Sequence, residues 1–204
     1  LPKCGGRADV ARLCAQLAVL EVQTGARSRA EIIPLVTETA ASLGAMDYRD
    51  ASDRLTALAF AGEDLSADLG VAARDEAGMN PLLADARRAV AIAASAAGVA
   101  AIDTPFPNPR DGDGLAREAA EAARLGFAGK MCIHPAQINA VHAAFRPSDS
   151  AMAWAEAVVG AFAASPGEGV TLLDGKMIDR AHLTLATRHL QRRELAKGSF
   201  VHAG

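Results

Sequence analysis

Hydrophobic and polar positions along the chain follow two alternating patterns, short apolar runs typical of strands and apolar spacing typical of helices. The short runs predict strands at residues 31–37, 55–61, 99–103 and 128–133. The helical spacing predicts helices at 8–24, 81–97 and 114–125, an irregular helical stretch around 40–54, a helix from Pro135, and helices from Ser148 onward that end with one at about 179–197. Strands and helices are therefore expected to alternate through most of the chain.

Turn and capping residues set the limits of several of these elements. Asn80 before Pro81 predicts a helix start, because an N-cap followed by proline at the first helical position favours one. Asp113 is the expected cap of the next helix. Residues 62–78 predict a loop, and residues 165–167 predict a break in the C-terminal helical region.

The alternation of strands and helices predicts a parallel α/β sheet with right-handed crossovers. Four strands are clear, and Leu1-Pro2-Lys3 has the character of the tail of a fifth. An eight-stranded β/α barrel typically needs about 250 residues, and residues 148–204 contain no strand–helix repeat. The pattern leaves two architectures, an open doubly wound sheet or the later part of a barrel.

Composition and charge narrow the class of partner. The net charge is −3 with acidic and basic residues interleaved, so neither nucleic acid nor a membrane is an expected partner. We expect no signal peptide and no transmembrane segment. Cys4, Cys14 and Cys132 have neither disulfide nor zinc spacing, which favours a cytoplasmic location. Cys132 is expected to be a small core residue.

Two carboxylates stand where strand-like runs end. Glu38 follows the first run and Asp64 follows the second, 64 − 38 = 26 residues later, which is about one strand–helix repeat. In a parallel array this spacing places both acids at the same edge, on neighbouring strands. Carboxylates in that position can hold a hard divalent cation, although loop acids and helix N-caps also occur there.

Six short motifs in order connect the chain to a known family. They are Leu1-Pro2-Lys3; Thr37-Glu38-Thr39; Gly62-Glu63-Asp64-Leu65 running to Asp68-Leu69-Gly70; Ala101-Ile102-Asp103-Thr104-Pro105; Gly126-Phe127-Ala128-Gly129-Lys130-Met131-Cys132-Ile133-His134-Pro135-Ala136-Gln137-Ile138; and Asp174-Gly175-Lys176-Met177-Ile178-Asp179. Together they resemble the citrate lyase β-subunit and malyl-CoA lyase family, over essentially the whole chain.

This resemblance implies a TIM-type (β/α)8 barrel, of which the chain holds about strands 4–8, with a helical C-terminal lid. The expected domains are a partial barrel at residues 1–147 and the lid at residues 148–204. Members of the family begin with three further β/α units. Those units carry an acidic stretch and an arginine that binds the acyl-acid portion of the substrate, and neither is in the sequence shown.

The resemblance also implies a reaction. The expected activity is Mg²⁺-dependent cleavage of a carbon–carbon bond in a citryl-CoA- or malyl-CoA-like thioester, which yields acetyl-CoA and a 2-oxo acid. Glu38 and Asp64 match the metal ligands of the family, and Glu38 is also expected to face the substrate. Glu63 is the weaker rival to Asp64 as a ligand, and Mn²⁺ is the alternative metal.

Three further residues match functional positions of the family. Asp179 matches an aspartate that handles the proton of the acetyl-CoA methyl group from the lid of a neighbouring subunit, so a homotrimer or hexamer is expected; an ordinary N-cap is the other interpretation. Lys130 and His134 lie where the family places CoA. Lys130 is interpreted either as a contact to a substrate phosphate or carboxylate or as a buried ion-pair partner, and His134 as a residue that shapes the substrate pocket.

Other functions stay open at this point. A thioesterase that hydrolyses a malyl-CoA-like ester is the nearest rival among enzymes. A CoA-independent pyruvate aldolase would share the acidic pair, but the motifs around Lys130 and before Asp179 argue against it. A non-catalytic remnant that binds a partner is the alternative from another class. The glycine-containing segments fit no phosphate loop, which argues against nucleotide hydrolysis and hydride transfer.

Overall fold

The computed structural model of the chain describes residues 1–198, and the last residues of the expected lid, 199–204, lie outside this range. The chain divides into two compact units, the first at Leu1–Phe145 and the second from Arg146 onward. Each unit has a hydrophobic core of its own. Among the described residues, no helix is both long and apolar enough to cross a bilayer.

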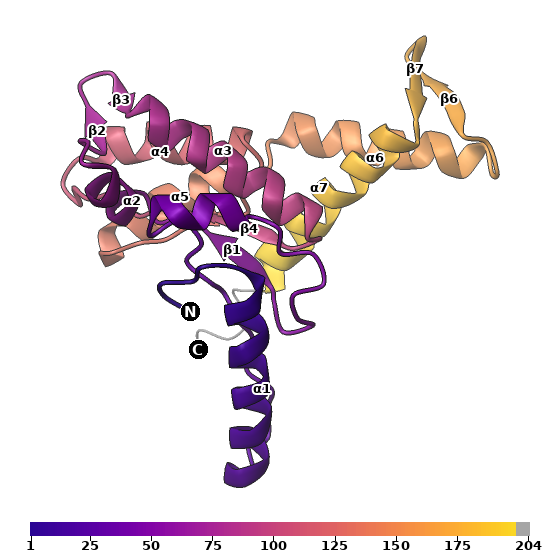
Figure 1. The fold of residues 1–204 in the computed structure, drawn as a ribbon. Helices are drawn as coiled ribbons and strands as arrows, with labels where there is room; N and C mark the ends of the chain where they lie inside the picture. Colours follow the sequence, from indigo (N-terminus) through magenta and orange to yellow (C-terminus); the bar gives the residue numbers. More distant parts are fainter. Residues whose placement is uncertain (199–204) are drawn as a thin grey trace. The chain divides into compact units, whose positions relative to one another are not determined.

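Unit 1 contains helices and short strands in alternation (Figure 1). Its helices are α1 (Arg7–Thr24), the 3₁₀ helix η1 (Ala40–Ala45), α2 (Gly62–Leu69), α3 (Pro81–Ala96), α4 (Gly112–Arg124), the 3₁₀ helix η2 (Pro135–Gln137) and α5 (Ile138–Phe145). Its strands are β1 (Ala57–Ala59), β2 (Arg74–Asp75), β3 (Gly78–Met79), β4 (Ala100–Asp103) and β5 (Gly129–Lys130). The expected helices at 8–24, 81–97 and 114–125 are confirmed as α1, α3 and α4.

The central sheet is parallel and runs in chain order, β1-β4-β5. Two isolated parallel bridges, Ile32 to Leu55 and Leu35 to Ala59, continue it on the β1 side. The backbone N–H of Leu35 in turn donates to the carbonyl of Leu1 at 2.8 Å. Consecutive segments therefore lie next to one another as in part of a parallel barrel, and the described strands do not close into a ring.

The expected strand at 31–37 is reduced to those two bridges. Pro34 lies in its middle and has no N–H for a ladder of hydrogen bonds. Its carbonyl still accepts a hydrogen bond from the Ala59 N–H at 2.9 Å. The segment therefore keeps its place in the sheet and fails to form a regular strand.

Two expectations about local structure in unit 1 are wrong. The predicted loop at 62–78 contains the helix α2 and the short β2–β3 hairpin. The cap of α4 is Asp111, whose Oδ1 accepts from the Gly114 N–H at 2.8 Å, and Asp113 lies inside the helix. The Asn80 cap is confirmed, since its Oδ1 accepts from the Leu82 N–H at 3.0 Å.

Within residues 146–198, unit 2 contains two helices and a hairpin. They are α6 (Asp149–Ala164), β6 (Val170–Leu173), β7 (Lys176–Asp179) and α7 (Arg180–Gly198). The sequence predicted only the helices and the break between them. The hairpin turn has Asp174 at φ 51° and Gly175 at φ 75°, and Asp-Gly between extended segments is a strong hairpin signal. That signal was available in the sequence.

Candidate functional site

Glu38 and Asp64 lie on either side of one positive charge. Glu38 follows the segment that bridges to β1, and Asp64 lies in the first turn of α2, directly after β1. The Lys3 Nζ is 3.4 Å from Glu38 Oε1 and 3.8 Å from Asp64 Oδ1. The structure therefore brings the two predicted metal ligands together, as their spacing at neighbouring strand ends implied.

Lys3 is the residue at this site that sequence reasoning missed. Its backbone N–H donates to Glu38 Oε2, and its φ of 52° is in the left-handed region that only a few non-glycine residues adopt. Its side chain is 69% exposed, whereas that of Glu38 is 7% exposed. The signal was present, because Lys3 ends an apolar segment at the same edge of the sheet.

Hydrogen bonds tie the segments that carry the two acids to each other. The hydroxyl of Thr37, next to Glu38, accepts from the Ala61 N–H at 2.9 Å. Asp68, one helical turn beyond Asp64, accepts from the Ala40 N–H through Oδ2 at 2.7 Å. These bonds hold both ends of α2 against the segments on either side of Glu38.

The donor set suits a hard divalent cation. Within residues 1–198 no group of three or more His, Cys, Asp or Glu side chains could hold a metal ion, so a closed zinc-type site is not what this pair forms. Mg²⁺ keeps several waters and needs only one or two protein carboxylates, with substrate oxygens completing the octahedron. The Lys3 ammonium shows that the field of the pair attracts a cation. Glu38 and Asp64 would hold Mg²⁺, or Mn²⁺, which oxygen ligands also suit.

Lys130 lies in a buried ion-pair cluster. Its Nζ is 2.7 Å from Asp103 Oδ2 and 2.6 Å from Glu118 Oε1, and its side chain is fully buried. Arg87 forms a bidentate pair with Asp103, with both distances 2.8 Å. Of the two interpretations given to Lys130, the structure shows the ion-pair partner, because both carboxylates occupy its ammonium.

His134 and Cys132 lie beyond β5 at the surface. His134 Nδ1 accepts a hydrogen bond from the Ala136 N–H at 3.1 Å, which caps η2. This contact shapes the turn after β5. The expectation that Cys132 is a core residue is wrong, since its side chain is exposed. The strand there is only two residues long, so Cys132 lies outside the sheet.

Asp179 lies in unit 2, where β7 meets α7. Its Oδ1 accepts from the Ala181 N–H at 3.0 Å and from the His182 N–H at 3.3 Å, so it caps the helix. The His182 Nδ1 is 2.7 Å from the same oxygen. The hydrogen bond with the His182 side chain, followed by those from the backbone, lowers the pKa of Asp179 below its ordinary value. The carboxyl group is therefore ionised at neutral pH, and 41% of the Asp179 side chain is exposed.

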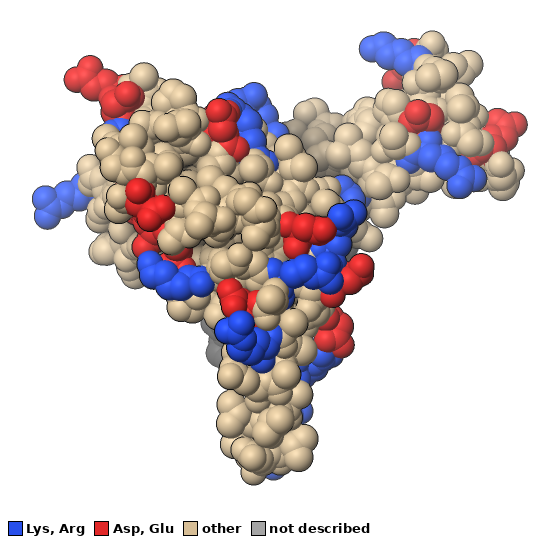
Figure 2. All heavy atoms as spheres, viewed as in Figure 1, with Lys and Arg blue, Asp and Glu red and all other residues tan. Residues whose placement is uncertain are grey.

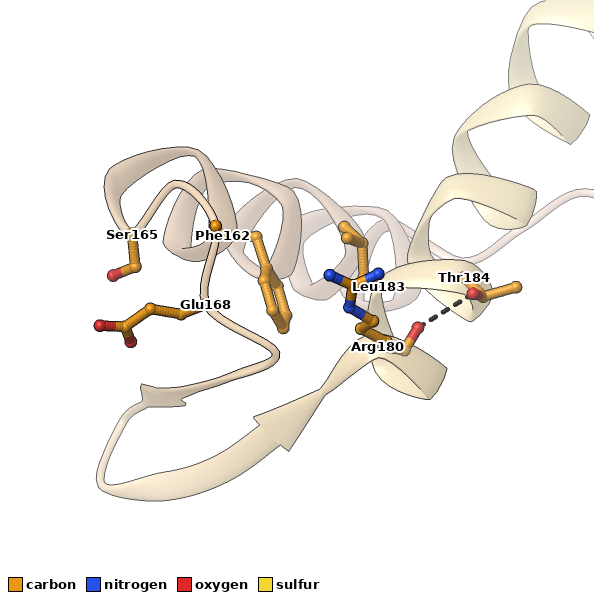
Figure 3. Close-up of a pocket in the computed structure, with 7 residues that line it drawn as sticks. Phe162, Ser165, Glu168, Arg180, Leu183 and Thr184 are labelled. Carbon is orange, nitrogen blue, oxygen red and sulfur yellow. Dashed lines mark hydrogen bonds between the residues drawn. The ribbon is translucent and has the colours of Figure 1, made fainter.

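A pocket of about 410 Å³ lies in unit 2 beside the start of α7. Its floor is apolar, from Phe162 and Leu183, and Arg180 and Glu168 add opposite charges. In the view of Figure 3, Phe162 lies between Arg180 on one side and Glu168 on the other. The Thr184 hydroxyl donates to the Arg180 carbonyl at 2.9 Å, which holds the first turn of the helix.

Charge on the surface is mixed. In Figure 2 acidic and basic side chains alternate over the face drawn, in agreement with the net charge of −3. Paired surface charges, such as Arg49 with Asp47 at 2.8 Å and Arg88 with Asp85 at 2.6 Å, contribute to this pattern. No single-sign surface that would attract a polyanion is visible on that face.

Comparison with known proteins gives matches over most of the chain. The sequence profile of the HpcH/HpaI aldolase/citrate lyase family matches residues 1–135, and that of the C–C bond lyases of the TIM-barrel fold matches residues 83–196. The L-malyl-CoA/beta-methylmalyl-CoA lyase of Rhodobacter capsulatus is 29% identical over 97% of this chain and 67% of its own length. The citrate lyase subunit beta-like protein of Mycobacterium tuberculosis is 35% identical over 92% of this chain and 73% of its own length.

Solved structures show the same likeness. CitE of Mycobacterium tuberculosis, in complex with magnesium, acetoacetate and coenzyme A, has a TM-score of 0.71 and 34% identity over 94% of this chain and 66% of that one. A citrate lyase from Burkholderia xenovorans LB400 has a TM-score of 0.81 and 26% identity over 97% of this chain and 63% of that one. The chain thus spans about two thirds of the length of these proteins, and the expected partial barrel is confirmed.

Proposed function

Because the chain belongs to the HpcH/HpaI aldolase/citrate lyase family, we propose that the protein is a Mg²⁺-dependent carbon–carbon lyase. Its substrate is a citryl-CoA- or malyl-CoA-like thioester, and its products are acetyl-CoA and a 2-oxo acid. The observation that carries the proposal is the position of Glu38 and Asp64. Both carboxylates lie at the carboxyl end of a parallel sheet, within 4 Å of the Lys3 ammonium group.

Each residue has a defined part in this reaction. Bound Mg²⁺ supplies a Lewis acid that stabilises negative charge on the oxygen of the 2-oxo acid. Glu38 and Asp64 bind and orient the cation, and buried Glu38 also bounds the space for the substrate. The hydroxyl of the substrate gives its proton to solvent water, the carbon–carbon bond breaks, and its electron pair forms the enolate of the acetyl thioester. Asp179 moves the proton at the methyl carbon: ionised because of its lowered pKa, it accepts that proton in the condensing direction, and in the cleavage direction it takes a proton from water and delivers it to the enolate carbon.

Lys130 and His134 support the site in this proposal. Lys130 fixes the ends of β4 and β5 through its two carboxylate partners. His134 shapes the turn after β5, where the substrate pocket is proposed to lie. We further propose that the protein is a cytoplasmic homotrimer or hexamer, in which the lid of one subunit serves the site of its neighbour.

A product assay tests the reaction. The protein is incubated with malyl-CoA, citramalyl-CoA or citryl-CoA and Mg²⁺, and the products are separated by chromatography. Acetyl-CoA with an equimolar 2-oxo acid is expected, and both are expected to be lost in Asp64→Asn. Free CoA with an intact hydroxy acid would instead make the protein a thioesterase. Absence of turnover of all three would favour a non-catalytic role.

A further inference from the structure

A network of charged side chains extends through unit 1 from the first turn of α2 to α4, buried at its centre and exposed at its two ends, where Glu63 is 49% and Glu121 39% exposed. Every member pairs with at least one other member. They are Glu63, Arg74, Arg87, Asp103, Glu118, Glu121 and Lys130. Buried ion pairs contribute little to stability by themselves, because desolvation offsets much of their attraction. Such a network at the ends of strands is therefore better explained by the geometry it imposes.

Arg74 joins three segments of this network, and one of its partners, Glu63, directly precedes the proposed metal ligand Asp64. Its Nε is 2.7 Å from Glu118 Oε2, and its Nη2 is 3.0 Å from Glu118 Oε1 and 3.2 Å from the carbonyl of Pro105. Its Nη1 donates to Glu63 Oε1. The guanidinium also lies 5.6 Å from the centre of the Phe106 ring. Only 15% of the Arg74 side chain is exposed.

These contacts place Arg74 next to the segment that carries Asp64. Glu63 is the residue before Asp64, and both lie in the first turn of a helix only eight residues long. The N–H of Gly62, which begins the helix, donates to the hydroxyl of Thr104 at 3.0 Å, and Pro105 follows Thr104. Arg74 thus contacts both segments that this hydrogen bond joins. It contacts the start of α2 through Glu63 and the loop after β4 through the Pro105 carbonyl.

We infer that Arg74 is a positioning residue that fixes Asp64 for metal binding. The inference rests on the proposed function, since it assumes that Glu38 and Asp64 hold Mg²⁺. Arg74 touches neither carboxylate of the pair. It acts by holding the first turn of α2 against the loop after β4, so that Asp64 faces Glu38 before the cation arrives. Preorganised ligands bind a metal more tightly because less ordering remains to be done on binding.

Because Arg74 is positively charged, electrostatics and positioning predict opposite changes in Mg²⁺ affinity when it is replaced. A positive charge near a cation site weakens cation binding, so removing it would tighten Mg²⁺ binding if electrostatics alone mattered. Positioning predicts the opposite. In Arg74→Met the affinity for Mg²⁺, measured by calorimetric titration, is expected to fall about tenfold, the size of effect seen when the partners of metal ligands are removed. Unchanged or tighter binding by folded Arg74→Met would overturn the inference.

Arg74→Lys covers the case in which the methionine variant does not fold. Lysine keeps the charge but lacks the planar fork that reaches Glu63, Glu118 and Pro105 together. Weaker Mg²⁺ binding is again expected, and an affinity equal to wild type would contradict the inference.

Glu121→Gln is the matched control. Glu121 lies at the opposite end of the same network, where it pairs with Arg87 at 3.0 Å, and it is 39% exposed. Its loss loosens the network without touching α2, so the Mg²⁺ affinity should stay within about twofold of wild type. An equal loss in Glu121→Gln and Arg74→Met would assign both to general destabilisation and overturn the positioning role.

Asp64→Asn separates this inference from the function on which it rests. If Asp64→Asn abolishes Mg²⁺ binding and Arg74→Met leaves it intact, only the role of Arg74 fails. If Asp64→Asn binds Mg²⁺ as wild type does, the metal site itself is misassigned and the role of Arg74 falls with it.

Discussion

At the scale of single residues, the main feature of the carboxylate pair Glu38 and Asp64 is the positive charge of Lys3, which lies between them. Glu38 is nearly buried and Asp64 is half-exposed, and both are within 4 Å of the Lys3 ammonium. Two carboxylates this close repel each other, and a cation between them relieves the repulsion. Lys3 therefore plays in part the role assigned to Mg²⁺, and the two cations compete for the same oxygens.

Replacing Lys3 by methionine should reveal this competition. Lys3→Met keeps the length of the side chain and removes the charge, so Mg²⁺ is expected to bind about threefold to fivefold more tightly, as follows for an exposed unit charge a few ångströms from its partners. Calorimetric titration with Mg²⁺ measures the change. Lys176→Met, an exposed lysine in the β6–β7 hairpin, is the control and should bind as wild type. Weaker binding by Lys3→Met would show that Lys3 orders the carboxylates rather than competing with the metal.

Single residues were predicted from sequence where a motif or a strand end marked them. Glu38 and Asp64 were found in this way, since adjacent parallel strands bring their carboxyl ends together. Lys3 and Arg74 were not, because a lysine or arginine in isolation is most often a surface charge and only the tertiary structure shows what it touches. Lys130 left two interpretations open for the same reason.

At the scale of elements, ion pairs connect helices and strands that are distant from one another in the sequence. Glu118 on α4 pairs with Arg74 on β2 and Lys130 on β5. Burial alone would raise the pKa of Glu118, but the hydrogen bonds from Arg74 and the charge of Lys130 outweigh it and lower the pKa below its ordinary value of 4.5. A lowered folded-state pKa means that this contribution to stability is complete above the unfolded-state pKa and is lost as the pH falls through the folded-state value.

Glu118→Gln should therefore change stability in a pH-dependent way. At pH 7 the variant is expected to lose on the order of 3 kcal/mol of unfolding free energy, since it leaves two buried cations short of a partner. The difference from wild type should shrink as the pH falls from 4.5 through the lower folded-state pKa of Glu118, because the wild-type carboxyl group becomes protonated first in the unfolded and then in the folded state. Urea unfolding at pH 7 and at successively lower pH measures this. A difference that stays constant over that range would show that the ionised form of Glu118 is not what stabilises the fold.

Helices and strands can be predicted from sequence where the residues that begin and end them are close to them in the chain. α1, α3 and α4 have a long apolar pattern with caps or a following glycine, so sequence alone placed them. α2 is eight residues long and its first turn is fixed by the hydroxyls of Thr37 and Thr104, which are distant in sequence. Its helical pattern is too short to stand out. The β6–β7 hairpin is the reverse case, because the local Asp174-Gly175 turn is sufficient to predict it.

At the scale of the whole molecule, the residues of the proposed reaction are divided between two units. Unit 1 holds the metal pair, and unit 2 holds Asp179. On the β6–β7 hairpin, register pairs Val170 with Asp179 and Leu172 with Met177, so these four residues share one face. Val170, Leu172 and Met177 are 48%, 67% and 63% exposed. Apolar side chains exposed beside Asp179 suit a surface that packs on another subunit, which supports the proposed oligomer.

Mixing two inactive variants tests whether the site is shared between subunits. Asp64→Asn lacks the metal site and Asp179→Ala lacks the proton-handling group, so each alone should be inactive. If Asp179 serves a neighbouring site, co-expression in equal amounts restores about a quarter of wild-type turnover, because that fraction of sites combines an intact Asp64 with an intact Asp179 from the neighbour. If Asp179 serves its own subunit, no mixed oligomer contains an intact site and the mixture stays inactive. Turnover per subunit in the purified mixed oligomer decides between the two, with light scattering to establish that the oligomer is intact.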